Sequence, residues 1–555
     1  MAKIAILGFG TVGSGVYEVL CRNAAGVSRR AGEPVEVKYI LDPKDFSNHP
    51  DAHLFIKNFD TILEDPEIKV VVETIGGTRF AYPYVKACLE SGRSVCTSNK
   101  EMVATYGAEL LGLAKEHRCA FLFEASVGGG TPIITPMHQC LAANVITEVE
   151  GIVNGTTNFM LTKMVRENLG FDDALKIAQE LGYAETKDPS DDVDGRDACR
   201  KIAILSSLVC GHQIYPQNIP TRGIRDITVQ DVQAAEKLDC AIKLIVWSRK
   251  NKDGSIAAAV EPMLVPFGNQ LAGVDDVFNA VLVKGDMLGD VVFYGKGAGK
   301  LPTASAVVAD VIDALKNGAA VHDSLFWQPA QPAEGQFRNE EYAPAYVRVN
   351  GLNGAVLQTI YGKGSVVFEQ DGQCAYLAEQ SNDSSLEQAA AKVQALGGSV
   401  AAGVEPCLVP KANQLASVDD VFNAVLVKGD MLGDVVFYGK GAGKLPTASA
   451  VVADVVDALK HGSKVHDSLF WQPAEPVEGM LTDPAPAAYY VRVAGIAPAV
   501  VEAIYGYGRV VDERYEGCAY FVERADEKAL AEAARKVEAV GGSVKLVLKR
   551  LPEEN

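Results

Sequence analysis

Short apolar runs alternate with helical patterns of apolar positions along the first third of the chain. The run Lys3–Leu7 predicts a buried strand. Similar runs follow at Val35–Leu41, Val70–Glu73, Ser94–Thr97 and Ala120–Phe123. Between them, helical spacing occupies residues 14–20, 80–90 and 101–117. Such alternation is typical of an α/β fold with a doubly wound parallel sheet, which we therefore predict.

A glycine-rich loop lies between the first predicted strand and the first predicted helix. A strand, a GxGxxG loop and a helix in this order indicate a dinucleotide site. The first glycine permits a tight turn, the second lets a pyrophosphate approach, and the third lets the helix pack closely. The alternative is a glycine-rich turn without a ligand. We predict cofactor contacts from Gly8, Phe9, Gly10, Thr11, Val12 and Gly13.

Three further positions at strand ends are candidate cofactor contacts. Asp42 ends the second predicted strand, where a carboxylate can bind a ribose 2′-hydroxyl and repel a 2′-phosphate. Lys44 follows closely and could meet a phosphate, so we favour NAD and keep NADP as the alternative. Thr74 and Lys100 follow the third and fourth strands. Because ligands of open α/β sheets bind at the carboxyl ends of strands, both are predicted to line the site.

The segment from Gly182 to Lys201 is the candidate for acid–base chemistry. It contains six carboxylates between Glu185 and Asp197. Asp197 and Lys201 are four residues apart in a helical pattern, so they share one face. Lys201 leads into an apolar run and can lose hydration, which suits a proton donor or acceptor. The alternative is a solvated acidic loop with a surface ion pair worth at most about 1 kcal/mol.

The last part of the chain is a tandem repeat. A unit that begins at Val260 begins again at Val404, an offset of 144 (404 − 260), and residues 274–311 are identical to 418–455. Each unit opens with strands, a glycine turn and an apolar helix from Thr303 or Thr447. Linkers rich in Pro, Glu and Ala follow at 328–343 and 472–487. Repetition on this scale indicates duplicated domains.

Each unit closes with a βαββαβ pattern, at residues 345–402 and 489–548. In the second unit the predicted strands and helices are Tyr489–Val493, Ala497–Tyr505, Arg509–Arg514, Cys518–Glu523, Glu527–Val540 and Ser543–Leu548. The identical segment before them can complete a sheet only once per chain. Its second copy could swap into a partner subunit, pair with another surplus copy, or stay docked.

Composition narrows the class of protein. The chain has 555 residues, enough for three or more domains, and its formal net charge of −19 argues against a nucleic-acid partner. Its 11 cysteines show no CxxC pairs, so neither a zinc site nor a disulfide framework is indicated. No apolar run approaches the roughly 20 residues of a membrane span. We therefore expect a cytoplasmic protein with reduced thiols and no membrane partner.

Seven motifs of the chain together resemble homoserine dehydrogenase, in order and at similar spacing across residues 1–318. They are FGTVGSGV, SNKE, EASVGGGTPII, NGTTNF, ELGYAE, DGRDACRK and GKGAGKLPTASAVVADV. The resemblance implies an NAD(P)-dependent oxidoreductase that interconverts L-homoserine and L-aspartate 4-semialdehyde in threonine, methionine and isoleucine biosynthesis. Reducing an aldehyde needs a hydride and a proton, and a lysine beside the carbonyl oxygen can supply the proton.

The same resemblance assigns roles to residues of this sequence. It implies that Lys201 is the acid–base group and that Asp197 orients it. Glu185 and Asp192 would bind the substrate, and Lys100 would line the nicotinamide pocket. Gly182, Gly297 and Gly299 would approach the cofactor. A monovalent cation such as Na⁺ would be held, mostly by backbone carbonyls, at Glu124, Val127, Gly129 and Thr131.

One feature departs from the family pattern. Glu185 and Asp197 are 12 residues apart (197 − 185), one more than is usual in the family, with the extra residue at Thr186 or Lys187. A loop insertion generally costs little free energy, so we expect a bulge before Pro189 that leaves both ends in place. If the bulge misplaced a ligand, however, the rate could fall about 10²-fold.

The resemblance also predicts the domains. They are a Rossmann-type nucleotide domain at 1–130 with a return helix at about 303–318, an α+β substrate domain at 131–302, and two ferredoxin-like ACT modules at 340–403 and 485–552. Residues 404–475 would be the second copy of 260–331. ACT modules bind amino acids, so we expect feedback by an effector, threonine being the first candidate, in a homodimer or homotetramer. The alternatives are a catalytically impaired amino-acid sensor and a dehydrogenase of another amino acid.

Overall fold

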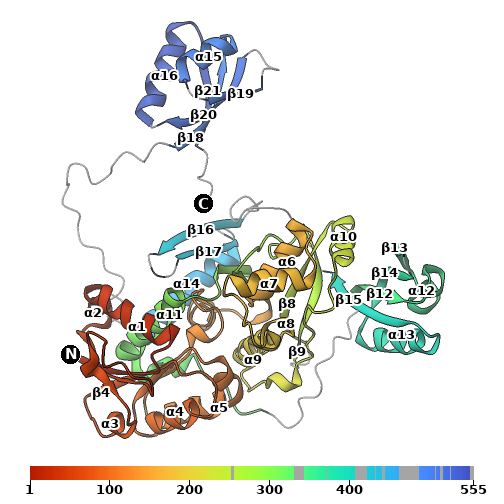
Figure 1. Ribbon diagram of the computed structural model, residues 1–555. Coiled ribbons are helices and arrows are strands. Elements are labelled where there is room, and N and C mark those ends of the chain that lie inside the picture. Colours follow the sequence, from red (N-terminus) through yellow and green to blue (C-terminus); the bar gives the residue numbers. More distant parts are fainter. Residues whose placement is uncertain are drawn as a thin grey trace. The chain divides into compact units, whose positions relative to one another are not determined.

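The structure is a computed structural model, and it falls into two compact units that divide between Leu469 and Phe470 (Figure 1). Each unit is described by itself. The residues described are 1–251, 256–330, 343–370, 372–406, 422–429, 431, 433–440, 444–461, 487–506, 508–512, 517–525 and 527–549. Most of the two predicted linkers and the end of the strand predicted at 509–514 therefore lie outside the described residues.

A six-stranded parallel sheet forms the N-terminal part of the first unit. Its order is β3-β2-β1-β4-β5-β6, and the chain changes direction across the sheet at β1. The strands are β1 (Ala2–Leu7), β2 (Val35–Leu41), β3 (Phe55–Ile56), β4 (Ile68–Glu73), β5 (Ser94–Thr97) and β6 (Phe121–Leu122). The helices between them are α1 (Thr11–Arg22), α2 (Ala24–Ala31), α3 (Asp60–Leu63), α4 (Ala81–Glu90) and α5 (Lys100–Glu116). The predicted doubly wound parallel sheet is thus confirmed.

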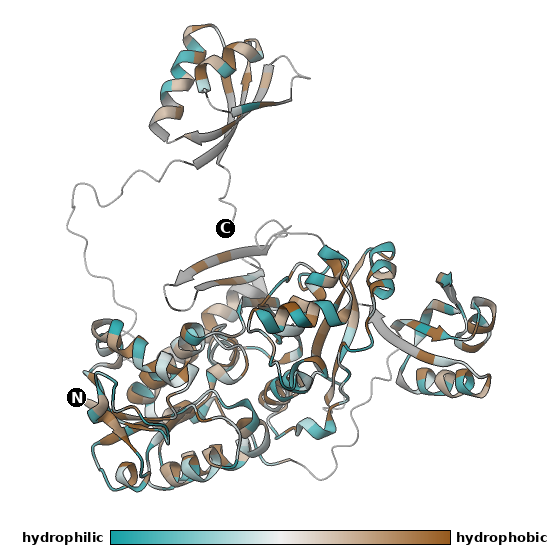
Figure 2. Ribbon diagram, viewed as in Figure 1, coloured by the Kyte–Doolittle hydropathy of each residue, from teal (hydrophilic) through white to brown (hydrophobic). Residues whose placement is uncertain are grey.

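The strands of this sheet are mostly apolar, as Figure 2 shows. Every residue of β5 and nearly every residue of β1 is buried, because helices cover both faces of a doubly wound sheet. One of these covering helices comes from far along the chain. Helix α11 (Lys300–Asn317) packs against α1, and a Cβ at Gly15 of α1 would meet the backbone of Lys300 at 2.7 Å.

An antiparallel sheet in the order β9-β8-β7-β10-β11 forms the second layer of the first unit. Its strands are β7 (Ile146–Ile152), β8 (Cys240–Lys250), β9 (Ile256–Pro266), β10 (Phe278–Gly285) and β11 (Gly289–Lys296). The helices between β7 and β8 are α6 (Gly155–Glu167), α7 (Phe171–Glu180), α8 (Ser190–Val193), α9 (Arg196–Cys210) and α10 (Val229–Lys237). Helices α6 and α9 pack on this sheet.

The chain does not continue from the glycine loop at 127–131 straight into a regular helix. Backbone amides of Ile133, Ile134 and Thr135 bond to the carboxylate of Glu124, and a single π-helical turn follows at Pro136–Cys140. Because Pro136 has no N–H to donate, a regular helix cannot run through it from the loop.

A βαββαβ module continues the antiparallel sheet on one side. Its elements are β12 (Ala343–Asn350), α12 (Gly354–Tyr361), β13 (Gly364–Gln370), β14 (Gln373–Ser381), α13 (Asp383–Ala395) and β15 (Ser399–Pro406), with strand order β13-β14-β12-β15. The end of β15 pairs in parallel with β9, through Glu405 opposite Met263.

The second compact unit has the same topology. Its elements are β18 (Ala487–Ala494), α15 (Pro498–Tyr505), β19 (Gly508–Asp512), β20 (Gly517–Ala525), α16 (Glu527–Ala539) and β21 (Ser543–Lys549), with strand order β19-β20-β18-β21. The register is also shared, because Tyr346 opposes Leu377 as Tyr490 opposes Phe521, each shifted by 144 residues. The element order is the βαββαβ pattern expected from the sequence.

The second copy of the repeated segment lies on the other side of the antiparallel sheet. It contains the hairpin of β16 (Phe422–Gly429) and β17 (Gly433–Lys440), followed by α14 (Lys444–His461). Strand β17 pairs with β11, so the described residues form one continuous sheet of eleven strands from β13 to β16. Figure 1 shows this hairpin beside the antiparallel sheet.

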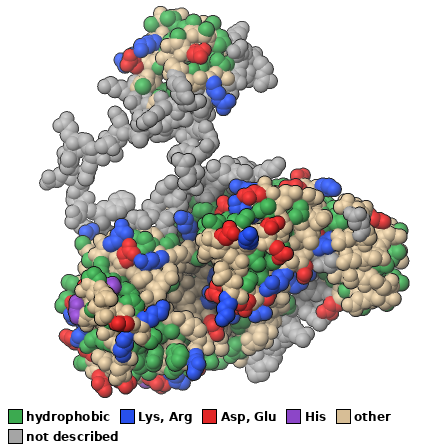
Figure 3. Space-filling view, viewed as in Figure 1, with side chains coloured by type: hydrophobic (Ala, Val, Ile, Leu, Met, Phe, Trp, Pro, Cys, Tyr) green, Lys and Arg blue, Asp and Glu red, His purple; other side chains and the backbone are tan. Residues whose placement is uncertain are grey.

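On the face shown in Figure 3, acidic and basic side chains are interspersed over the first unit. In the parts of the chain that the structure describes, no helix combines the length and the apolar character needed to cross a bilayer.

Candidate active site

The predicted Asp197–Lys201 pair forms in the first turns of α9. The helix begins after Gly195, whose φ of +79° is a left-handed conformation that glycine adopts without strain. Lys201 Nζ lies 2.8 Å from Asp197 Oδ2 and donates a 2.7 Å hydrogen bond to the carbonyl of Val153, at the end of β7. The two side chains are only 10% and 8% exposed, which excludes a solvated surface pair.

Two further side chains complete this polar cluster. Lys100 Nζ, at the start of α5, lies 2.9 Å from Asp197 Oδ1, so the carboxylate is held by two ammonium groups. The Asn154 amide nitrogen donates to Asp197 Oδ2 at 2.9 Å and to Asp192 Oδ1 at 2.8 Å. The Asn154 side-chain oxygen accepts from the backbone of Thr157, which fixes the orientation of the amide.

The charges of the cluster shift three pKa values. Burial alone would raise the pKa of Asp197, but the Lys201 and Lys100 charges and the hydrogen bonds outweigh it and hold that pKa below its usual range. The charge of Asp197 raises the pKa of Lys100. Burial raises the pKa of Asp192, while the hydrogen bond from Asn154 opposes this. Asp197 therefore stays ionised, and Asp192 takes up a proton more readily than an exposed aspartate does.

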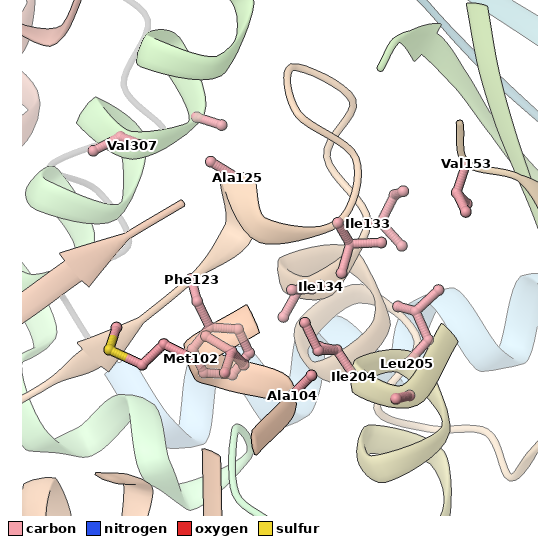
Figure 4. Packing of buried hydrophobic residues seen from close by; sticks show 14 of the residues in the cluster. Met102, Ala104, Phe123, Ala125, Ile133, Ile134, Val153, Ile204, Leu205 and Val307 are labelled. Atoms are coloured by element: carbon pink, nitrogen blue, oxygen red, sulfur yellow. The ribbon is translucent and has the colours of Figure 1, made fainter. Parts of the chain in front are cut away.

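A shared apolar core fixes the elements that carry these side chains. Met102 and Ala104 of α5, Ile204 and Leu205 of α9, and Phe123 belong to one buried cluster, as Figure 4 shows. Close-packed interiors leave little room for helices to shift. Lys100 and Lys201, each within four residues of this core, are thereby held at one place between the two sheets.

The glycine loop after β1 has the geometry that a pyrophosphate needs. Gly8 has a φ of +92°, and a Cβ at Gly13 would lie 2.0 Å from the carbonyl oxygen of Gly8, so α1 packs tightly against the loop. A Cβ at Gly10 would meet no protein atom within 4 Å. The N-terminus of α1 therefore borders open space, where a phosphate group can approach the backbone.

Asp42 is buried beside this loop, and both of its oxygens accept backbone hydrogen bonds. Phe9 donates to Oδ2 at 2.7 Å and Lys44 donates to Oδ1 at 2.8 Å. The Lys57 ammonium donates to the Asp42 backbone carbonyl at 2.9 Å. The carboxylate thus orders the loop, and each oxygen keeps a lone pair for a ribose hydroxyl. The Lys57 ammonium lies close enough to offset part of the negative charge of Asp42.

Thr74, the first residue after β4, closes the other side of the loop. Its hydroxyl lies 3.0 Å from the carbonyl oxygens of both Leu7 and Gly8, which share its single hydrogen. The preceding Glu73 is fully buried and accepts hydrogen bonds from Ile75, Gly76 and Thr97. The side chain of Thr74 therefore holds the turn after β1 in place.

The loop of the predicted cation site packs against the glycine turn before α11. A Cβ at Gly129 would lie 2.2 Å from the carbonyl of Gly297, and the hydroxyl of Thr131 bonds to the Lys296 carbonyl. Val127 is fully buried, and Gly299, directly before α11, has a φ of +131°. Three backbone amides take up three of the four lone-pair sites of the Glu124 carboxylate, so main-chain carbonyls are the more available cation ligands in this loop.

Two predicted residues lie apart from the cluster. Gly182 and Glu185 are exposed in the turn after α7, Gly182 with a φ of +75°, and the backbone carbonyl of Glu185 accepts a hydrogen bond from Gln179. Among the described residues, no hydrogen bond or ion pair links the Glu185 carboxylate to Lys201. Thr186 and Lys187, where we predict the extra residue, lie in an exposed bend before Pro189, and Asp192 beyond it reaches the cluster.

Sequence reasoning missed several residues of the site. The motif NGTTNF was noted for its polar side chains, but nothing in its spacing predicted that Asn154 would bridge two carboxylates. The Val153 carbonyl could not be identified because every residue has one. Asn279 of β10 is fully buried and donates to this same carbonyl at 3.2 Å.

Two family models match this chain. The homoserine dehydrogenase NAD binding domain matches residues 8–124, and the homoserine dehydrogenase model matches residues 132–312 and 341–456. The two segments of the second match end at equivalent positions of the repeat, since 456 − 312 is 144. The family pattern is therefore found again in the duplicated segment.

Known homoserine dehydrogenases are also similar to this chain over most of their length. A homoserine dehydrogenase of Bacillus subtilis (strain 168) is 38% identical over 378 residues, which cover 66% of this chain and 86% of the relative. One of Neisseria gonorrhoeae is 42% identical over 336 residues, which cover 59% of this chain and 77% of the relative. The crystal structure of a homoserine dehydrogenase from Thiobacillus denitrificans is similar with a TM-score of 0.65 at 35% identity, over 74% of this chain and 98% of that one. This chain belongs to the homoserine dehydrogenase family.

Proposed function

We propose that Lys201 is the acid–base group of this NAD(P)-dependent homoserine dehydrogenase. The observation that carries the proposal is the position of its ammonium, which Asp197 and the Val153 carbonyl hold at a nearly buried place. An ammonium has three N–H groups, and the described residues accept two of them. The third is left for the oxygen of the substrate.

This geometry suits proton transfer in both directions. During reduction of the aldehyde, Lys201 donates a proton to the oxygen on which negative charge develops. During oxidation of homoserine, the neutral amine accepts the hydroxyl proton. Asp197 orients the lysine and stabilises its charged form, while Lys100 adds a second positive charge beside the developing alkoxide.

The amino-acid end of the substrate needs carboxylate partners for its α-ammonium. We assign Asp192 to this role because Asn154 holds it within the Lys201 cluster. Glu185 belongs to the same proposal, but its carboxylate must turn from solvent toward the site when substrate binds. The exposed bend at Thr186–Lys187 gives this part of the chain room to move.

The residues around the glycine loop fit a nicotinamide dinucleotide, which supplies or accepts the hydride when bound. Open space at Gly10 and the start of α1 fits the pyrophosphate, and the buried carboxylate of Asp42 fits a ribose hydroxyl. The further proposed contacts are Gly8, Phe9, Thr11, Val12, Gly13, Thr74, Lys100, Gly182, Gly297 and Gly299. NAD is favoured by Asp42, and NADP is the alternative because Lys44 and Lys57 lie nearby.

A monovalent cation site at the loop of Glu124, Val127, Gly129 and Thr131 is a separate proposal. The glutamate carboxylate is occupied by three amides, so main-chain carbonyls would supply the ligands, which suits Na⁺ better than a transition metal. The role would be structural, because the loop packs on the Gly297 turn beside the cofactor site. Varying Na⁺ against choline chloride during thermal unfolding tests this.

The two βαββαβ modules are proposed to be ACT modules that bind threonine as a feedback effector. Their support is the shared topology and register, since ACT modules have this ferredoxin-like arrangement. Domain limits at 1–130, 131–302, 340–403, 404–475 and 485–552, and assembly into a homodimer or homotetramer, belong to the same proposal.

Steady-state kinetics with L-homoserine test the proposed function directly. Turnover is measured with NAD and with NADP, in the presence and absence of threonine, and the pH profile of kcat/KM is recorded. Activity that depends on Lys201 supports the mechanism, and threonine inhibition supports the ACT assignment. Threonine binding without turnover would instead favour the impaired sensor, and turnover of another amino acid would favour the third alternative.

A further inference from the structure

The hairpin of β16 and β17 covers the edge of the antiparallel sheet that β11 would otherwise expose. Its sequence is a second copy of β10 and β11, with an offset of 144 residues. The first copy joins the sheet through its first strand, β10, which pairs with β7. The second copy joins through its second strand, β17, which pairs with β11. The two identical segments therefore occupy different places in one sheet.

The pairing of β11 with β17 has a local two-fold symmetry. Its centre is Phe293 opposite Phe437, which are equivalent positions because 437 − 144 is 293. On either side, Val291 opposes Gly439 and Gly295 opposes Val435. Gly439 is the copy of Gly295 (439 − 144) and Val435 is the copy of Val291 (435 − 144). Val291 therefore pairs with the copy of Gly295, and Gly295 pairs with the copy of Val291. The edge of β11 is thus complementary to a second copy of itself.

Side chains on one face of β11 and β17 follow the same symmetry. Val292 and Tyr294 share a buried apolar cluster with their copies, Val436 and Tyr438. All four are less than a tenth exposed. Helix α14 adds a contact beyond the sheet, because Ser449 is hydrogen-bonded to the Asn144 amide at 2.9 Å. The hairpin is therefore packed onto the sheet rather than merely adjacent to it.

The second copy leaves exposed the valines that the first copy buries. Val281 of β10 is 0% exposed and its copy Val425 is 59% exposed, while Val307 of α11 is 0% exposed and its copy Val451 is 56% exposed. Val283, Val308 and Val311 are buried in the same way, and their copies Val427, Val452 and Val455 are 43%, 48% and 51% exposed. Strand β7 and helix α1, which pack beside the first copy, occur once in the chain.

We propose that the second copy takes the place of a two-fold partner, so that this chain closes the β11 edge from within itself. If two chains paired through β11, each would contribute the hairpin of β10 and β11 together with its own β7 and α1, which pack beside that copy. The second copy brings the same hairpin without a second β7 or α1, which accounts for its exposed valines. The edge of β11 is consequently occupied, and any assembly of several chains must use other surfaces. This inference does not depend on the proposed catalytic roles.

Cysteine pairs in the full-length chain test this arrangement. A Cβ at Gly439 would lie 3.6 Å from Val291 Cγ2, so Val291→Cys with Gly439→Cys places two sulfurs across the β11–β17 pair. The matched variant Val291→Cys with Gly295→Cys reports β11 pairing between two chains. Phe293→Cys is a second reporter of that pairing, because residue 293 would face itself across the two-fold axis. The substitutions also distinguish the otherwise identical peptides of the two copies in mass spectrometry.

The expected result is a 291–439 disulfide within single chains, in a fraction that dilution before oxidation leaves unchanged. The two reporter variants should give no chain-to-chain link above the background of the unmodified protein. Links of 291 to 295 or of 293 to 293 between chains would overturn the proposal. A 291–439 link that joins two chains would also overturn it, and such a link would appear as mixed-isotope dimers when labelled and unlabelled chains are oxidised together. So would the absence of the 291–439 link in a variant whose thermal unfolding is unchanged.

Discussion

Lys100 and Asp197 form a 2.9 Å ion pair between the first residue of α5 and the first turn of α9. The pair joins the nucleotide-binding part of the chain to the substrate-binding part. It also places a second cation on the carboxylate that orients Lys201. The two parts that must bring hydride and proton together are therefore connected at the atoms where the reaction is proposed to occur.

Replacing Lys201 with Met should lower kcat at least about 10²-fold, because the proton donor is lost while the side-chain volume is kept. Dinucleotide affinity, measured by fluorescence titration, should change little, since Lys201 lies at the substrate end. The control is Lys163→Met, which removes a surface lysine that also has a carboxylate, Glu167, four residues away. Wild-type turnover in Lys201→Met would remove the central assignment.

Replacing Asn154 with Ala should reduce kcat/KM by about 10²-fold, because misplaced catalytic groups cost rates of this size. The variant should also change the pH profile. The hydrogen bond from Asn154 lowers the pKa of Asp192, so its loss raises that pKa further, and the acidic limb of kcat/KM should move to higher pH. A lower rate with an unmoved limb would show that Asp192 does not bind the substrate. Thr156→Ala on the same helix is the control.

Gly10→Ala should weaken dinucleotide binding without changing the thermal unfolding temperature, because a Cβ there meets no protein atom. Gly13→Ala should affect both measurements, since its Cβ would lie 2.0 Å from the Gly8 carbonyl. Gly112→Ala, on the open side of α5, is the control for an added methyl group. Unchanged affinity in Gly10→Ala would place the pyrophosphate elsewhere.

Glu150→Gln should stabilise the protein at pH 8, whereas Glu148→Gln should destabilise it. Burial raises the pKa of Glu150 in the folded protein, and Glu148 beside it adds to this. A carboxyl with a raised pKa binds more protons folded than unfolded, so stability falls as pH rises from the unfolded pKa through the folded one. Neutral glutamine removes that loss.

Glu148 has the opposite sign. Burial alone would raise its pKa, but the hydrogen bond with Glu150 and the interactions with Arg249 and Lys284 outweigh burial and lower that pKa. The contribution of Glu148 to the stability of the folded protein is present above its unfolded pKa and is lost as pH falls through its folded pKa. Urea unfolding of both variants between pH 5 and pH 8 measures the two effects. Equal shifts in the two variants would contradict this account of the pair.

Arg348→Ala should destabilise the first module by about 3–5 kcal/mol, because it leaves the buried carboxylate of Asp231 without its cation. Arg348 Nε lies 2.8 Å from Asp231 Oδ1, with side chains 5% and 0% exposed, and the pair joins β12 to α10. Limited proteolysis should then cut the module more readily. Adding Asp231→Asn removes the unpaired charge and should recover part of the loss. No recovery would mean that packing, rather than charge, holds this contact.

The sequence by itself determined the local features. Residues four apart on a helix must meet, so the Asp197–Lys201 pair followed from spacing, and the glycine loop followed from its place between an apolar strand and a helix. The strand at Val35–Leu41 and the βαββαβ order followed from local periodicity in the same way.

The tertiary structure decided contacts between residues far apart in the chain. Lys100 meets Asp197 only because α5 and α9 pack on one core, and Asn154 bridges two carboxylates only because β7 ends beside α8 and α9. The repeat gives the plainest case. Val281 and Val425 stand in identical sequence, yet one is buried and the other is exposed, because strand β7 pairs with β10 of only one copy. Whether a residue is buried depends on which elements pack against it. A local sequence that is identical in both copies cannot specify that difference.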